Sequence, residues 1–226
     1  MFFLFALASA ANADSPLLEE VKKNFGDPLP PKIAVTRVID GDTIEVAGGI
    51  TVRLLGIDTP EAAKGKLPAQ PFAGDAKRFV ENAIIGSGNK VTLYKDAAMQ
   101  VGKFGRDLAW VIVDTPDGEK VLQELLLEEG LAKVWLQYAP PLKLHYLLEA
   151  ENKAQIFEEK KKRGKNIWEN FPEPAGKTVW IAPHSTKYHT EKCGKAKIGN
   201  LKGIPVGIPP EQAEAHGLTP CNVCKP

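Results

Sequence analysis

Three short β-branched segments, each separated from the next by a tight turn, constrain the fold of this chain most. The segments cover residues 33–39, 43–46 and 50–57, and the turns fall at 40–42 and 48–49. Alternating β-branched residues favour strands, and Asp-Gly and Gly-Gly pairs favour the tight turns of antiparallel hairpins. The sequence therefore predicts a three-stranded meander.

Two more strands and three helices follow the predicted meander. Strand-like residues cover 91–94 and 108–113, and apolar residues at helical spacing cover 71–85, 121–131 and 142–162. Helices inserted after the third and fifth strands favour a small closed barrel of the OB type. We therefore expect an α+β fold that is mainly β: a five-stranded OB-fold barrel with about three packed helices, plus a small C-terminal zinc-type module.

Changes in composition along the chain predict five segments. These are a signal peptide over 1–13, a lead-in with a short helix over 14–32, the barrel domain over 33–171, a linker over 172–178 and a small Cys/His domain over 179–226. The first segment is uncharged and ends in Ala-Asn-Ala, which is typical of a signal-peptide cleavage site; the alternative is the apolar terminus of a cytosolic protein. We expect a secreted or periplasmic monomer, with no membrane span after removal of the signal peptide.

Charged side chains gather around the predicted third strand. Arg53 lies inside an apolar strand, so it needs an anion, which is either a protein carboxylate or a substrate phosphate. Asp58 is an odd number of residues from Arg53, so we expect it beyond the strand end, where Gly56 lets the chain bend. Asp42 and Asp58 offer hard oxygen ligands suited to Ca²⁺ or Mg²⁺.

A second arginine and a further carboxylate extend this set. Arg106 stands at the start of the fifth predicted strand, and Glu61 follows the third. Two arginines can bind one phosphate and stabilise the charge that grows in its transition state, and a carboxylate can position or deprotonate water. Together with a metal ion, these groups can hydrolyse a phosphodiester. The net charge of only +1 argues against a protein that holds nucleic acid through a broad basic surface alone.

The order of these motifs resembles that of the staphylococcal nuclease (thermonuclease) family over residues 32–170. The matching segments are 38–43, 53–61, 104–106, 130–134 and 166–168. The resemblance implies a catalytic Ca²⁺ site formed by Asp42, Asp58 and the backbone carbonyl of Thr59. It also implies that Asp40 is a nearby acid that does not itself bind the ion.

The same resemblance implies a reaction. Arg53 and Arg106 would bind the scissile phosphate, and Glu61 would act as general base. DNA and RNA would be cut at the 5′ side of the phosphate to leave 3′-phosphates. Two alternatives stay open: a non-catalytic nucleic-acid-binding OB module with a zinc interaction domain, and an interaction protein whose catalysis is vestigial. The retention of every residue of the implied centre favours the enzyme.

Substrate-binding residues are only partly retained relative to the family. Lys103 precedes Phe104, which stands where the family has a tyrosine that contacts phosphate. Leu136 replaces the first of two tyrosines that flank the nucleotide in the family, and Tyr138 retains the second. The resemblance therefore implies Lys103, Phe104 and Tyr138 as substrate-binding residues, with altered nucleotide stacking.

A second group of residues lies in the C-terminal segment. His189, Cys193, Cys221 and Cys224 supply one imidazole and three thiolates in two close pairs, which suits a tetrahedral structural Zn²⁺. The run 217–224 resembles the small zinc-binding domain of the Ada DNA-repair protein, in which the first ligand is a cysteine. The alternative is a Cys221–Cys224 disulfide with Cys193 free. Without a metal or a bridge, so small a unit has little core to hold it.

The remaining histidines show no spacing typical of ligands. We expect His145, His184 and His216 to be ordinary surface residues. The lysines of the C-terminal segment could touch phosphates, but a run of charge is usually a solvated face.

Overall fold

The computed structural model describes the central part of the chain and much of its C-terminal segment. The described residues are 14–25, 29–95, 106–136, 144–155, 167–168, 177–181, 186–193 and 206–226. The predicted signal peptide and the predicted substrate-binding residues Lys103, Phe104 and Tyr138 lie outside them, as does His184. No helix within the described ranges combines the length and apolar character needed to cross a membrane.

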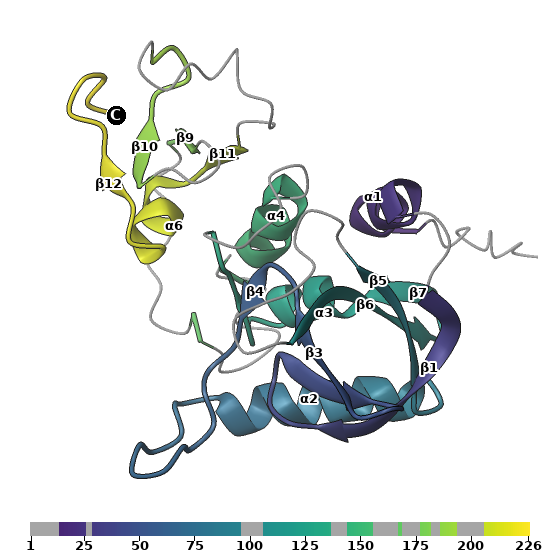
Figure 1. Cartoon of the computed structure of the whole chain (residues 1–226). Coiled ribbons are helices and arrows are strands. Elements are labelled where there is room, and N and C mark those ends of the chain that lie inside the picture. Colours follow the sequence, from purple (N-terminus) through teal and green to yellow (C-terminus); the bar gives the residue numbers. More distant parts are fainter. Residues whose placement is uncertain are drawn as a thin grey trace, which may run out of the picture.

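A closed barrel forms the centre of the structure (Figure 1). Its strands follow the order β3-β2-β1-β5-β6, and β3 returns to pair with β6 in parallel, which closes the ring. The strands are β1 (Leu29–Val38), β2 (Thr43–Val46), β3 (Ile50–Leu54), β5 (Lys90–Lys95) and β6 (Asp107–Thr115). The predicted five-stranded barrel of the OB type is therefore confirmed. The short helix expected in the lead-in is α1 (Pro16–Phe25), and β1 already begins at Leu29, within the residues assigned to the lead-in.

Short strands at one end of the barrel depart from the prediction. The third strand ends at Leu54, and a turn at Gly56, with φ of 79°, leads into the two-residue strand β4 (Ile57–Asp58). β4 pairs antiparallel with β8 (Lys133–Val134). Asp58 thus lies beyond the third strand, after a bend at Gly56, as its spacing from Arg53 predicts. A further strand, β7 (Gly118–Val121), extends β6 through a hairpin.

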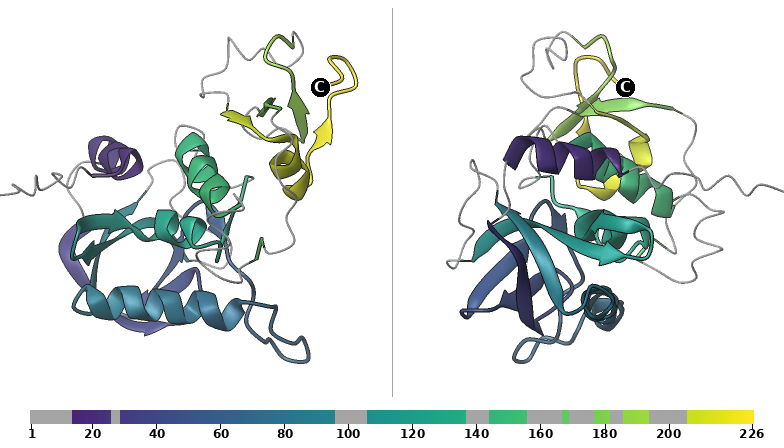
Figure 2. Two further views of the ribbon diagram at one scale, coloured as in Figure 1. Left: turned by 180° about the vertical axis from the view of Figure 1, so that it is seen from behind. Right: turned by 90° about the vertical axis from the view of Figure 1, so that its right-hand side faces the viewer.

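Among the described residues, four helices lie around the barrel (Figure 2). They are α1 (Pro16–Phe25), α2 (Ala73–Gly86), α3 (Leu122–Glu128) and α4 (Leu144–Gln155). α2 contacts β1, β5 and β6, whereas α3 packs against α4 and β6. α2 buries Ala76, Val80 and Ile84, which recur every fourth residue and so share one face. The predicted helix over 121–131 is shorter in the structure, because Val121 ends β7 and Gly130 takes a positive φ of 65°.

The C-terminal segment forms a small sheet that packs on α4. Its strands follow the order β11-β9-β10-β12, and a short helix lies between β11 and β12. The elements are β9 (Val179–Ile181), β10 (Lys187–His189), β11 (Val206–Ile208), α6 (Pro210–Ala215) and β12 (Thr219–Pro220). Val179, Ile181 and Leu218 belong to the same buried apolar cluster as the barrel interior. The exact segment boundaries stay a prediction, but the described parts share one hydrophobic core.

Candidate functional site

Arg53 lies buried between two carboxylates. Its Nη1 forms an ion pair with Oδ1 of Asp42, and its Nη2 lies 3.0 Å from Oδ1 of Asp58. The same Nη2 donates a hydrogen bond to the carbonyl of Ile57 at 3.3 Å. The sequence predicts either a protein carboxylate or a substrate phosphate as the partner of Arg53. In this structure its partners are protein carboxylates.

Asp42 is fixed on both of its carboxylate oxygens. Its Oδ2 accepts hydrogen bonds from the amide nitrogen and the hydroxyl of Thr59, each at 2.9 Å, and its Oδ1 accepts one from the hydroxyl of Thr43 at 3.1 Å. The amide of Asp42 in turn donates to Oδ1 of Asp40 at 3.1 Å. This network holds the turn after β1 against the end of β4, which places Asp42, Asp58 and Thr59 at one end of the barrel.

Gly41 is required by the close approach of neighbouring elements. A Cβ at this position would lie 2.7 Å from Cβ of Ala76 and 2.8 Å from Oγ1 of Thr59. Such distances are shorter than atomic contacts allow, so any side chain would push α2 or Thr59 away. The Asp-Gly pair therefore serves the packing of this site as well as the turn.

The second arginine reaches the same region through the parallel pairing that closes the barrel. Arg106 directly precedes β6, in which Leu108 pairs with Arg53 of β3. Burial lowers the pKa of Arg53, the charges of Asp58 and Asp40 oppose this shift, and the positive charge of Arg106 adds to it. The Arg53 guanidinium thus interacts electrostatically with the Arg106 guanidinium and with the carboxylates of Asp58 and Asp40.

Glu61 lies on the exposed loop that follows β4. Its amide nitrogen donates to Oε1 of Gln70 and its carbonyl accepts from the amide of Gln70, both at 2.9 Å. This double contact ties the loop at its base and leaves Glu61 exposed to solvent. A group that takes a proton from water needs such access.

An aromatic residue that the sequence reasoning missed covers the guanidinium group of Arg53. The carbon Cζ of Arg53 lies 5.5 Å from the ring centroid of Trp135, and this tryptophan is 36% exposed. The amide of Trp135 donates to the carbonyl of Gly56 at 2.9 Å, which fixes the ring at the end of β8. Trp135 directly follows the segment 130–134, which resembles the nuclease family, and that position was the available signal.

The four predicted zinc ligands converge in the C-terminal segment. One ligand atom from each of His189, Cys193, Cys221 and Cys224 lies within 4.8 Å of the others, and no disulfide joins any of these three cysteines. The parallel pairing of β10 with β12 brings His189 near Cys221. Zinc bonds of about 2.3 Å to sulfur place tetrahedral ligands about 3.8 Å apart, so this cluster is close to the required size.

The electrostatics of this cluster also fit a cation. The backbone N–H groups of Cys224 and Val223 lower the pKa of Cys221 to about 7. Burial lowers the pKa of His189, and the charge of Lys187 adds to the shift. The Nδ1 atom of His189 is buried without a hydrogen-bond partner among the described residues. A neutral imidazole and thiolates are the protonation states that a zinc ion needs.

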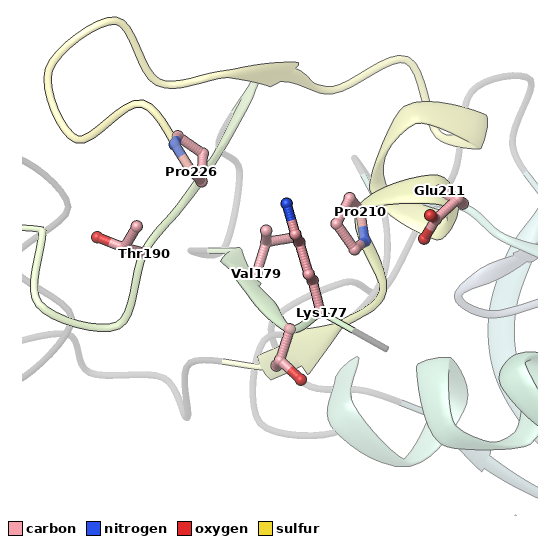
Figure 3. A pocket seen from close by; sticks show the side chains of 7 residues that line it. Lys177, Val179, Thr190, Pro210, Glu211 and Pro226 are labelled. Atoms are coloured by element: carbon pink, nitrogen blue, oxygen red, sulfur yellow. The ribbon is translucent and has the colours of Figure 1, made fainter. Parts of the chain in front are cut away.

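An open pocket of about 480 Å³ lies in the C-terminal segment (Figure 3). Its lining combines one basic and one acidic side chain with prolines and threonines. The lining residues are Lys177, Thr178, Val179, Thr190, Pro210, Glu211 and Pro226. Neither Arg53 nor any cysteine lines it, so the pocket belongs to neither of the two candidate sites.

Two histidines expected at the surface are buried at least in part. The side chain of His216 is only 4% exposed, and its Nε2 lies 2.7 Å from Oε2 of Glu151. His145 is half-buried, its ring centroid lies 3.6 Å from that of Tyr146, and burial lowers its pKa. The expectation of an ordinary surface position is therefore wrong for His216.

Comparison with known proteins relates most of this chain to one family. A family model described as staphylococcal nuclease homologue matches residues 51–170. The thermonuclease of Staphylococcus intermedius is 35% identical over 161 residues, which cover 70% of this chain and 86% of that protein. The thermonuclease of Staphylococcus hyicus is 36% identical over 140 residues, which cover 60% and 75%.

A prophage relative is similar over a shorter stretch. The SPbeta prophage-derived endonuclease YokF of Bacillus subtilis is 41% identical over 114 residues, which cover 49% of this chain and 36% of that protein. The chain therefore spans about a third of YokF but most of the length of the two thermonucleases. The match to the family model ends before the Cys/His cluster begins.

Proposed function

The chain belongs to the staphylococcal nuclease family and carries its nuclease domain, and we propose that this domain is a calcium-dependent endonuclease that hydrolyses DNA and RNA to 3′-phosphate products. One observation carries the proposal. Buried Arg53 lies between Asp42 and Asp58, and Arg106 directly precedes β6, the strand that pairs with β3 beside it. Two arginines that can bind an anion and two carboxylates that can bind Ca²⁺ thus lie at one end of the barrel.

The donor set supports a calcium site. Asp42, Asp58 and the carbonyl of Thr59 offer oxygen only, and the hydrogen bonds from Thr59 already fix the Asp42 carboxylate. When bound there, Ca²⁺ would polarise the phosphate and the attacking water. The Arg53 guanidinium has two carboxylate partners, so a phosphate oxygen can replace one of them without leaving the arginine unpaired.

The proposed reaction assigns a role to each side chain. Arg53 and Arg106 donate hydrogen bonds to the phosphate oxygens and stabilise the charge that develops on them. Glu61 takes a proton from the attacking water, whose oxygen bonds to phosphorus while the bond from phosphorus to the 5′ oxygen breaks. The leaving 5′ oxygen takes up a proton, which yields a 5′-hydroxyl and a 3′-phosphate.

We further propose that His189, Cys193, Cys221 and Cys224 bind a structural Zn²⁺, and that this C-terminal segment is similar to the zinc-binding domain of the Ada protein. Support comes from the convergence of the four ligand atoms and from the unpartnered, buried Nδ1 of His189. Export and a monomeric state stay predictions from the sequence.

A plasmid-degradation assay tests the nuclease proposal. Wild type should degrade plasmid DNA, and RNA in a parallel assay, with Ca²⁺ and fail to do so when EGTA, a calcium-selective chelator, is present. Glu61→Ala and Arg106→Ala should each lose most of the activity, because each removes a group that acts on the transition state. Arg78→Ala is the matched control, since Arg78 is an exposed arginine on α2. Equal degradation by wild type and Arg106→Ala would contradict the proposal.

A further inference from the structure

Glu151 is a fully buried carboxylate shared between two parts of the molecule. It lies on α4, and its Oε1 accepts a hydrogen bond from the amide of Val134 at 2.8 Å. Its Oε2 lies 2.6 Å from Nε2 of Gln212 and 2.7 Å from Nε2 of His216. A buried carboxylate is costly unless its oxygens are satisfied, and here one oxygen depends on the barrel and the other on the C-terminal segment.

On one side, Glu151 is connected to the proposed nuclease centre through β8. Val134 lies in β8 and pairs with Ile57 of β4, and the next pair joins Lys133 to Asp58. Glu151 therefore holds the strand to which Asp58, the proposed calcium ligand and partner of Arg53, is paired. The pairing of β8 with β4 thus links the Glu151 carboxylate to the proposed metal site.

On the other side, Glu151 is connected to the Cys/His cluster through Gln212 and His216. Gln212 lies on α6 and His216 directly follows it; β12 and then Cys221 come next along the chain. Gln212 also donates to the carbonyl of Leu148 at 3.3 Å, which places α6 beside α4 (Figures 1 and 2). The fold of the Cys/His segment thus determines where the two donors of Glu151 stand.

We propose that Gln212 and His216 are positioning residues for the nuclease centre, acting through Glu151. By satisfying one oxygen of Glu151, they keep its other oxygen on Val134 and so fix β8, β4 and Asp58. Without them, the unpaired oxygen would draw water into the interior and let β8 shift. The C-terminal segment then contributes to the position of Asp58, a proposed calcium ligand. This inference rests on the proposed function.

Calcium titrations of the full chain test this role. His216→Leu and Gln212→Met remove one donor each at similar size. Each should raise the half-saturating Ca²⁺ concentration by roughly tenfold, the scale of a lost hydrogen bond to a charged group, with little change in rate at saturating Ca²⁺. His216→Gln, which can still donate, should restore most of the wild-type value.

A control variant separates positioning from mere loss of stability. None of the described hydrogen bonds of Glu151 involves Ile208, a buried residue of the same C-terminal core. Ile208→Ala should lower stability while leaving the half-saturating Ca²⁺ concentration unchanged. An unchanged value in His216→Leu, or an equal increase in Ile208→Ala, would overturn the inference.

Hydrogen–deuterium exchange gives a readout that does not depend on activity. The amides of Val134 and Trp135 should exchange faster in His216→Leu than in wild type or Ile208→Ala, because β8 loses its support. Unchanged exchange at these amides would also overturn the inference. If wild type itself degrades no nucleic acid with Ca²⁺, the proposed function is wrong. The exchange data still decide whether Gln212 and His216 hold β8 through Glu151.

Discussion

Both the amide nitrogen and the hydroxyl of Thr59 donate to the same oxygen of Asp42, each at 2.9 Å. The pair joins the loop after β4 to the turn after β1, and both residues are buried. Asp42 can therefore face Arg53 with its other oxygen without turning away. The relationship shows that the proposed metal ligands are pre-positioned by the fold itself.

Thr59→Val should weaken this arrangement. The substitution keeps the shape of the side chain and the backbone hydrogen bond but removes the hydroxyl donor from buried Asp42. We expect the free energy of unfolding to fall by about 1–3 kcal/mol, the cost of a lost hydrogen bond to a buried charged group. Urea denaturation measures the change. Thr59→Ser keeps the hydroxyl and should lose less; equal losses in both variants would contradict the hydrogen-bond explanation.

Gly41→Ala should destabilise the protein through overpacking. The added methyl group would lie 2.7 Å from Cβ of Ala76, so α2 must move away from the turn. We expect a loss of about 1–3 kcal/mol in unfolding free energy, visible as a lower Tm. Gly86→Ala is the control, since nothing lies within 4 Å of its added Cβ and its φ is not positive. A Tm as high in Gly41→Ala as in Gly86→Ala would refute this account.

Trp135→Ala should weaken phosphate binding beside Arg53. The ring lies 5.5 Å from the guanidinium carbon, and its loss exposes the arginine to water. We expect affinity for a short oligonucleotide to fall by about 0.5–2 kcal/mol, the range of a cation–π contact. Fluorescence-anisotropy titration at one fixed salt concentration measures the affinity. Trp135→Phe keeps an aromatic face and should retain most of it, whereas equal losses would point to some other role for the indole.

Zinc affinity should fall as the pH is lowered from 8 to 6. The pKa of Cys221 is lowered to about 7, so its thiolate is favoured above that pH and takes up a proton below it. Burial and the charge of Lys187 lower the pKa of His189, which favours its neutral imidazole. Competition with a chromophoric chelator gives the affinity, and metal analysis should find one zinc per chain. Binding that is equally tight at both pH values would count against thiolate ligation.

The barrel was predictable because its strands carry a strong local pattern. Segments such as 43–46 and 50–57 are rich in β-branched residues, and the turns beside them contain Asp-Gly or Gly-Gly. The position of Asp58 followed from its odd spacing to Arg53 and from Gly56, which takes a positive φ. These features depend on neighbouring residues, and a single sequence records them directly.

Features built from long-range contacts were not predictable. β4 and β8 have two residues each, too few for any periodicity, and they exist because they pair with each other. The strands β9 to β12 have only two or three residues each. His216 looked like a surface residue because its partner, Glu151, lies far away in the sequence on another helix. Burial of a polar residue by a distant partner leaves no local pattern.

The parallel pairing of β3 with β6 has a consequence for the order of events during synthesis. Arg53 and Arg106 lie on opposite sides of α2 and β5 in the sequence, and they become neighbours only when the ring of strands closes. A nascent chain that has emerged only as far as α2 contains one arginine of the proposed phosphate clamp and lacks its companion. Arg53 and Arg106 therefore cannot bind one phosphate together until translation has passed β6 and the barrel has closed.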